Sequence, residues 1–112
     1  MNLLILGDVM GASGRKALSN TLPELIKKFQ IDFVIVNGEN ASDDGKGITQ
    51  EITEEFFKSG VDVITSGNHI WDKKETTDFI EKESRLLRPA NLVSGSPGRG
   101  SVSYTHLRAH ET

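Results

Sequence analysis

The chain has 112 residues, of which 16 are acidic and 13 basic, and it contains no cysteine. This length suits one small domain. The net charge of −3 argues against a protein that coats nucleic acid or binds membranes through a basic patch. The absence of thiols excludes disulfides, thiolate metal sites and cysteine nucleophiles. No apolar run approaches the roughly 18 residues of a membrane span, and the first residues lack signal-peptide features, so we expect a cytoplasmic protein.

The first elements alternate between strand and helix. Leu3–Leu6 is a short apolar run, typical of a strand buried on both faces. Apolar residues at helical spacing then predict a helix over 13–29, and Pro23 inside this pattern predicts a kink or break near Thr21. A β-branched strand over 32–37 follows, and then a polar loop over 41–47.

The alternation continues in the second part of the chain. Thr49 is expected to begin a helix that Gly60 ends. A strand over 61–65, a helix over about 72–81 and a fourth strand beginning at Leu92–Val93 follow, before a Gly/Ser/Pro loop. This pattern predicts an α/β fold of alternating βα units with a mainly parallel sheet.

Three predicted strands end in the same way, with a glycine followed by side chains that can bind metal. The segments are Leu6-Gly7-Asp8, Asn37-Gly38-Glu39-Asn40 and Ser66-Gly67-Asn68-His69. Asp8 and Glu39 are 31 residues apart, and Glu39 and Asn68 are 29 apart, which is about one βα repeat. We therefore expect all three segments at the carboxyl edge of one sheet, where α/β folds build their sites, with glycine allowing close approach of the backbone.

The residue types at these strand ends favour a metal site. Asp8 and Glu39 offer carboxylates, Asn40 and Asn68 offer amide oxygens, and His69 offers an imidazole. Such a set suits Mn, Fe or Zn, and a carboxylate between two cations can bridge them. The alternative is that Asp8 and Asn68 cap turns and His69 only packs, but three coincident strand ends disfavour it.

Other motifs in the sequence give weaker indications of function. The loop around Lys46 could touch a phosphate but lacks the spacing of a P-loop. Gly11-x-x-Gly14 lacks the glycines of a dinucleotide-binding motif. Trp71 is expected to be a packing anchor rather than a platform for base stacking.

Together, these motifs resemble the calcineurin-like metallophosphoesterases. Gly45-Lys46-Gly47, Gly67-Asn68-His69-x-Trp71-Asp72 and Arg88-Pro89-Ala90-Asn91 are similar to the YmdB-type branch of that family, as is Gly38-Glu39-Asn40-Ala41. The resemblance covers about residues 1–100. It implies the N-terminal half of a metallophosphoesterase α/β sandwich and a 2′,3′-cyclic nucleotide 2′-phosphodiesterase.

By matching position, the resemblance implies that Asp8 ligates a first metal that Asn40 completes, and that Glu39 bridges both metals. It implies that Asn68 ligates the second metal, and that His69 is the catalytic acid beside the phosphate. The cofactors would be two divalent ions, Fe or Mn, and the substrate a cyclic nucleotide or another small phosphodiester. The substrate-binding residues are not identified. We expect no membrane or polymeric nucleic acid as partner, and a homo-oligomer is an open alternative.

The chain departs from the family in length. Family chains are more than twice as long, and their second half brings further histidines to the metals, including a His-x-His pair. Met10 stands where most calcineurin-like enzymes have a histidine, as this branch allows. His106 and His110 match the missing pair neither in spacing nor in flanking sequence. We therefore expect residues 1–102 to be the N-terminal part of the domain, and we expect this part to be impaired as an enzyme when alone.

Residues 103–112 show neither helical nor strand periodicity. They are interpreted either as an unstructured terminus or, as we favour, as a tail unrelated to the preceding natural segment, which would end near residues 100–102. Two other readings of the whole chain stay open. It could be a non-catalytic phosphate- or nucleotide-binding module that uses glycine-rich loops and helix N-termini. It could also be a folding fragment whose exposed sheet edges make it self-associate.

Overall fold

A computed structural model describes residues 1–104 of the chain. Strands β1 (Leu3–Leu6), β2 (Phe33–Asn37) and β3 (Val63–Thr65) form one sheet in the order β1-β2-β3. Both pairs are parallel, with Leu3 opposite Phe33 and Ile35 opposite Val63. A parallel sheet connected through helices confirms the predicted α/β class.

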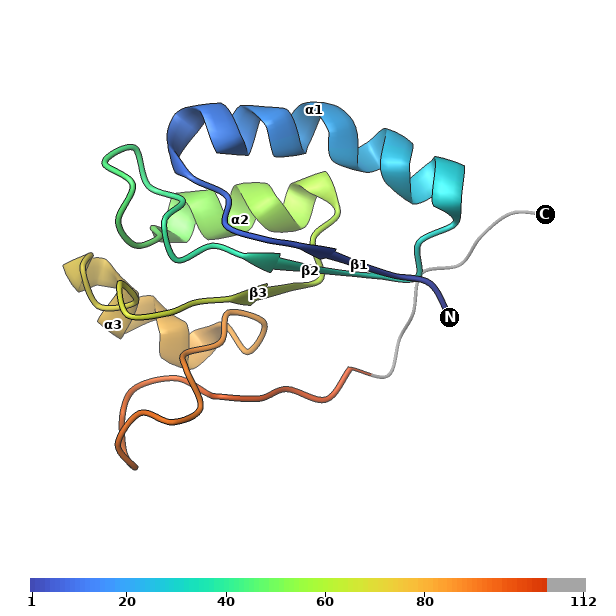
Figure 1. Ribbon diagram of the computed structural model, residues 1–112. Coiled ribbons are helices and arrows are strands. Elements are labelled where there is room, and N and C mark those ends of the chain that lie inside the picture. Colours follow the sequence, from blue (N-terminus) through green and yellow to red (C-terminus); the bar gives the residue numbers. More distant parts are fainter. Residues whose placement is uncertain (105–112) are drawn as a thin grey trace.

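The helices lie on both sides of this sheet. Helices α1 (Gly11–Phe29) and α2 (Gln50–Ser59) lie together on one side, whereas α3 (Lys74–Phe79) lies on the other (Figure 1). A short 3-10 turn, η1 (Ile80–Lys82), continues α3, so the helix predicted over 72–81 is present but shorter and divided. None of the helices within residues 1–104 has the length and apolar character needed to cross a membrane.

The ends of α2 follow from its sequence. The hydroxyl of Thr49 accepts a hydrogen bond from the backbone N–H of Ile52 at 3.2 Å, which satisfies one of the free donors of the first turn. Gly60 ends the helix with a φ of 114°, a value that other residues rarely adopt. Both predicted limits of this helix are confirmed.

The predicted break near Thr21 is wrong, because α1 runs unbroken through Pro23. A proline at this position removes the hydrogen bond that its nitrogen would donate to the carbonyl of Ser19. Both Ser19 and Pro23 are exposed, so water can satisfy that carbonyl. The loss therefore falls on the solvent face of the helix and leaves the buried face intact.

The main core lies between the sheet and the α1–α2 layer. It contains side chains that are at most 2% exposed, among them Leu22, Val34, Val36, Phe56 and Ile64. The expectation that β1 is buried on both faces is wrong: Leu4 and Leu6 pack on the core, but Leu3 is 51% and Ile5 68% exposed. The reason is that β1 is an edge strand, and α1 and α2 cover only one of its faces.

The prediction of a fourth strand at Leu92–Val93 is also wrong. These residues lie in turns, and Val93 is 78% exposed. The sheet is instead extended by Leu86 and Leu87, through a parallel bridge between Ile64 and Leu86. Leu86 is fully buried, so Leu86 and Leu87, rather than Leu92 and Val93, occupy the position beside β3.

Two other expectations concern single regions. Trp71 is half-buried and packs against the core, which confirms its role as a packing anchor. Most of the predicted tail, with His106 and His110, lies outside the described residues. Tyr104, the last described residue, packs edge-on against the ring of Phe33 with the ring centroids 4.8 Å apart.

Candidate functional site

The loops that follow the three strands emerge at one edge of the sheet, as the spacing predicts (Figure 1). The ends of β1 and β2 are joined by a side-chain contact in which Asn40 Nδ2 donates to Asp8 Oδ1 at 2.9 Å. Two backbone bonds support it: Val9 N–H donates to the Asn37 carbonyl and Gly11 N–H to the Asn40 carbonyl. The structure thus brings Asp8 and Asn40 together, with the carboxylate exposed at the sheet edge.

Glu39 links the end of β2 to the end of β3. A Cβ atom placed on Gly67 would lie 2.1 Å from Glu39 Oε2, so the carboxylate fills the space that this glycine leaves. Gly38 is packed in the same way, with a Cβ there 2.9 Å from Ile64 Cγ2. The expected close approach therefore holds at Gly38 and Gly67 but not at Gly7, where a Cβ would meet nothing within 4 Å.

The carboxylate of Glu39 has an unusual environment. Its Oε2 atom is buried and has no hydrogen-bond partner. Leaving a buried polar atom without a partner costs free energy, and such atoms in native structures call for an explanation. An anionic oxygen of this kind is suited to a cation, which would take the place of the missing donor.

His69 is held by a residue that the sequence analysis did not include in the site. Its Nδ1 atom lies 2.9 Å from Asp72 Oδ2, and the two side chains are 31% and 36% exposed. A carboxylate at Nδ1 favours the form of the ring that carries a proton there, which leaves Nε2 to face other groups. The His-x-x-Asp spacing in one turn was the signal for this pair. Asn68 is exposed immediately before it.

These contacts do not by themselves form a metal site. Within residues 1–104, no three histidine, cysteine or acidic side chains converge closely enough to hold a metal ion by themselves. Asp8 pairs with Asn40, Glu39 lies against Gly67, and His69 pairs with Asp72. The donors are of the types that hard divalent cations take, and the unpaired oxygen of Glu39 fits such an ion, so the residues suit a metal to which other ligands also bind.

The loop over residues 41–47 braces this edge of the sheet. The N–H of Gly47 donates to the Glu39 carbonyl at 2.6 Å, and a Cβ on Gly47 would lie 3.2 Å from the His69 carbonyl. Gly47 also has a φ of 81°, so a side chain there would be strained. The loop therefore ties the segment of Glu39 to the turn of His69.

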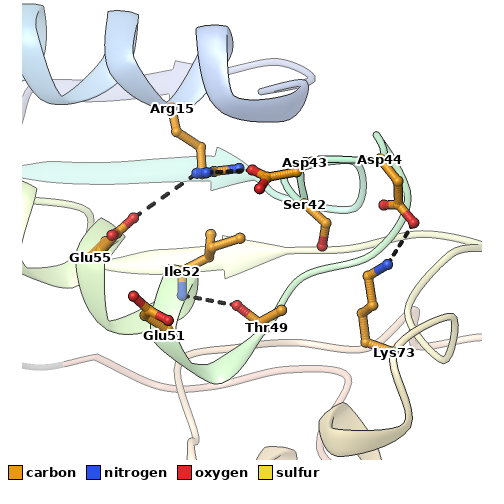
Figure 2. Close-up of a pocket in the computed structure, with 9 residues that line it drawn as sticks. All are labelled: Arg15, Ser42, Asp43, Asp44, Thr49, Glu51, Ile52, Glu55 and Lys73. Atoms are coloured by element: carbon orange, nitrogen blue, oxygen red, sulfur yellow. Dashed lines mark hydrogen bonds and ion pairs between the residues drawn. The ribbon is translucent and has the colours of Figure 1, made fainter.

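Two ion pairs hold the same loop in place, as Figure 2 shows. Arg15 on α1 bonds to Asp43 at 2.7 Å and to the Ala41 carbonyl at 2.6 Å. Lys73 bonds to Asp44 at 2.6 Å. The Lys73 ammonium, and then the backbone N–H of Lys46, lower the pKa of Asp44 below its ordinary value.

The pocket of about 460 Å³ between this loop and α2 is separate from the predicted metal ligands. It is lined by Arg15, Ser42, Asp43, Asp44, Thr49, Glu51, Ile52, Glu55 and Lys73 (Figure 2). Its two cations are already paired with carboxylates, and acidic residues outnumber them. We therefore assign this pocket a role in bracing the loop rather than in binding a phosphate.

Known proteins are similar to this chain both in sequence and in structure. A family model described as YmdB-like protein matches residues 4–111. A 2′,3′-cyclic-nucleotide 2′-phosphodiesterase of Bacillus subtilis is 45% identical over 111 residues, which make up 99% of this chain and 41% of that protein.

Two solved structures are also similar. The crystal structure of a novel phosphatase from Mycoplasma pneumoniae has a TM-score of 0.85 and 37% identity, over 93% of this chain and 38% of that one. A hypothetical protein from Thermus thermophilus has a TM-score of 0.80 and 39% identity, over 89% of this chain and 38% of that one. This chain therefore spans about two fifths of the length of the relatives it matches, and it belongs to the YmdB-like protein family.

Proposed function

We propose that this chain is the amino-terminal part of a metal-dependent phosphodiesterase that hydrolyses 2′,3′-cyclic nucleotides at a centre of two Fe or Mn ions. The observation that carries the proposal is the buried, unpaired Oε2 of Glu39, at the edge where Asp8 and Asn68 also lie. The name of the Bacillus subtilis relative supports the substrate class.

The residues divide into three roles. Asp8 and Asn40 would hold the first metal, Glu39 would bridge, and Asn68 would hold the second. When bound, such ions lower the pKa of a water molecule and neutralise the negative charge that develops on the phosphate.

His69 would act on the leaving group. With Nδ1 bound to Asp72, its Nε2 is the nitrogen that can carry a proton to the ribose oxygen as the phosphorus–oxygen bond breaks. Asp72 fixes the orientation of the ring through the contact at Nδ1. This division makes His69 the general acid and Asp72 its positioning residue.

The chain would supply these metal ligands, and the rest of the protein would supply further ligands. This follows from the incomplete set of ligands in residues 1–104 and from the 41% of the Bacillus subtilis relative that the chain spans. The proposal is therefore of weak or no activity for the 112 residues alone.

The test uses the whole protein, in which the missing part is restored. Hydrolysis of 2′,3′-cyclic AMP is measured with Mn²⁺ or Fe²⁺ for the wild type, for Asp8→Ala and for Asp78→Ala. Asp78 is an exposed acid on α3 and serves as the matched control. We expect Asp8→Ala to abolish turnover and Asp78→Ala to leave it unchanged.

Two results would contradict the proposal: no hydrolysis by the wild type, or hydrolysis that Asp8→Ala leaves intact. Nucleotide binding that needs no metal and survives Glu39→Gln would instead indicate a non-catalytic binding module.

A further inference from the structure

A fourth extended segment ends at the same sheet edge, beyond the three strand ends already described. Leu86 pairs with Ile64 in parallel, and the N–H of Leu87 donates to the Ile64 carbonyl at 2.9 Å. The hydroxyl of Ser66 donates to the Leu87 carbonyl. Arg88 therefore follows its extended segment beside Ser66, just as Asn68 follows β3.

The backbone fixes Arg88 in this place from its other side too. Its N–H donates to the Arg99 carbonyl at 2.9 Å, and Leu87 and Arg99 form a second parallel bridge. Arg88 is thus set between two extended segments at the edge of the sheet, next to Leu87, whose carbonyl accepts the hydrogen bond from Ser66.

The guanidinium of Arg88 lacks an anionic partner within residues 1–104. Arg15 pairs with Asp43 and Glu55, and Arg85 pairs with Glu83. Among the described residues, the guanidinium of Arg88 donates only from Nη1, to the Pro89 carbonyl at 3.0 Å, and its Nε is buried without an acceptor. Burying part of a permanent charge without a counter-ion is costly, so this group is suited to an anion.

We propose that Arg88 binds a non-bridging phosphate oxygen of the phosphodiester substrate. The proposal rests on the proposed function, because the metals that the neighbouring strand ends would hold would place the phosphate at this edge. A guanidinium is the side chain whose planar donors best match phosphate oxygens. Two other cations near the site, Arg15 and Lys73, are already neutralised by Asp43 and Asp44, and Lys46 in the same loop is exposed to solvent rather than partly buried as Arg88 is.

The experiment measures phosphate binding separately from turnover. The metal-loaded whole protein is titrated with inorganic phosphate in a calorimeter, and KM and kcat for 2′,3′-cyclic AMP are measured in parallel. The variants are Arg88→Met, which removes the charge, and Arg88→Lys, which keeps it without the planar fork. Arg85→Met is the control, since Arg85 stacks on the Phe57 ring at the other end of the same segment.

We expect Arg88→Met to weaken phosphate binding and raise KM about 10- to 100-fold, the range for loss of a hydrogen bond to a charged group. Arg88→Lys should fall between this variant and the wild type, and Arg85→Met should bind phosphate normally. Metal content should be the same in all four proteins.

Unchanged phosphate affinity in Arg88→Met overturns the proposal. If the melting temperature of that variant also falls, the anion that Arg88 meets is a carboxylate from the rest of the protein. A wild type that binds phosphate through Arg88 but hydrolyses no cyclic nucleotide would refute the proposed function and leave the role of Arg88 supported.

Discussion

Replacing Gly67 by alanine tests whether the carboxylate of Glu39 is held ready for a metal. The new Cβ would lie 2.1 Å from Oε2, 2.5 Å from Cδ and 2.8 Å from Oε1 of Glu39. Real Cβ contacts essentially never fall below 3.0 Å, so the carboxylate has to move by about 1 Å. Metal–ligand distances tolerate only about 0.2 Å, so a displacement of this size removes the oxygen from a bound ion.

The same change should cost little folding stability, because the group that moves is the far end of a flexible side chain. Overpacking a site usually costs about 1–3 kcal/mol, and we expect the low end of that range. For a chain of this size, about 1 kcal/mol lowers the melting temperature by roughly 4–8 °C. Affinity for Mn²⁺ should fall at least about tenfold, as when a group that positions a ligand is lost.

The assay is calorimetric titration of the whole protein, in which the missing part is restored, with Mn²⁺, combined with thermal unfolding of the 112-residue chain followed by circular dichroism. Gly7→Ala is the matched control, because Gly7 follows β1 as Gly67 follows β3 but has open space around it. We expect Gly7→Ala to bind Mn²⁺ like the wild type. Equal Mn²⁺ affinity in Gly67→Ala and the wild type would refute the reasoning about Glu39.

Three further changes test other parts of the site. Asp8→Asn should weaken Mn²⁺ binding at least about tenfold by calorimetry while changing unfolding free energy by about 0.5 kcal/mol or less, because Asp8 is exposed; a large loss of stability with normal binding would contradict this. Asp72→Ala should abolish the preference of the His69 ring for a proton on Nδ1, seen in long-range ¹H–¹⁵N spectra; an unchanged spectrum would show that Asp72 does not set it. Lys73→Met should raise the pKa of Asp44 in a ¹³C carboxyl titration, because the Lys73 ammonium lowers that pKa. The pKa of Asp44 in the folded state lies below its ordinary value. The contribution of the Lys73–Asp44 pair to folding stability is therefore fully present above the ordinary pKa and is lost as the pH falls through the folded-state pKa. An Asp44 titration that is identical in the wild type and in Lys73→Met would contradict this assignment of the pKa shift to Lys73.

The sequence predicted the parts of the fold that depend on local pattern. The capping hydroxyl of Thr49 and the glycine at position 60 mark the ends of α2, and both act within a few residues of the chain. The meeting of Asp8 and Asn40 could be predicted as well, because one βα repeat returns the chain to the same sheet edge.

The errors have a different origin, since they depend on what lies next to an element in space. Leu3 and Ile5 are exposed because nothing covers that face of β1, which its apolar sequence does not reveal. Leu86, rather than Leu92, lies beside β3 and is fully buried there, a difference that the two similar apolar pairs do not reveal in the sequence. The role of Asp72 was missed because its contact with His69 depends on the shape of one turn.

The uncovered face of the sheet and the proposed metal site meet at the same strand. Asp8 ends β1 and lines an open groove of about 470 Å³ between this strand and α1, together with Leu6 and Leu25. On the other face of β1, Leu3 and Ile5 are exposed, although a native sheet seldom leaves such side chains in water. Since the relatives are more than twice as long as this chain, one addition can resolve both features. A segment that covers β1 along its whole length would pass beside Asp8, where the proposed metal site needs further ligands. We therefore expect burial of β1 and completion of the metal site to occur together, and Mn²⁺ affinity and stability to rise in parallel when the rest of the protein is restored.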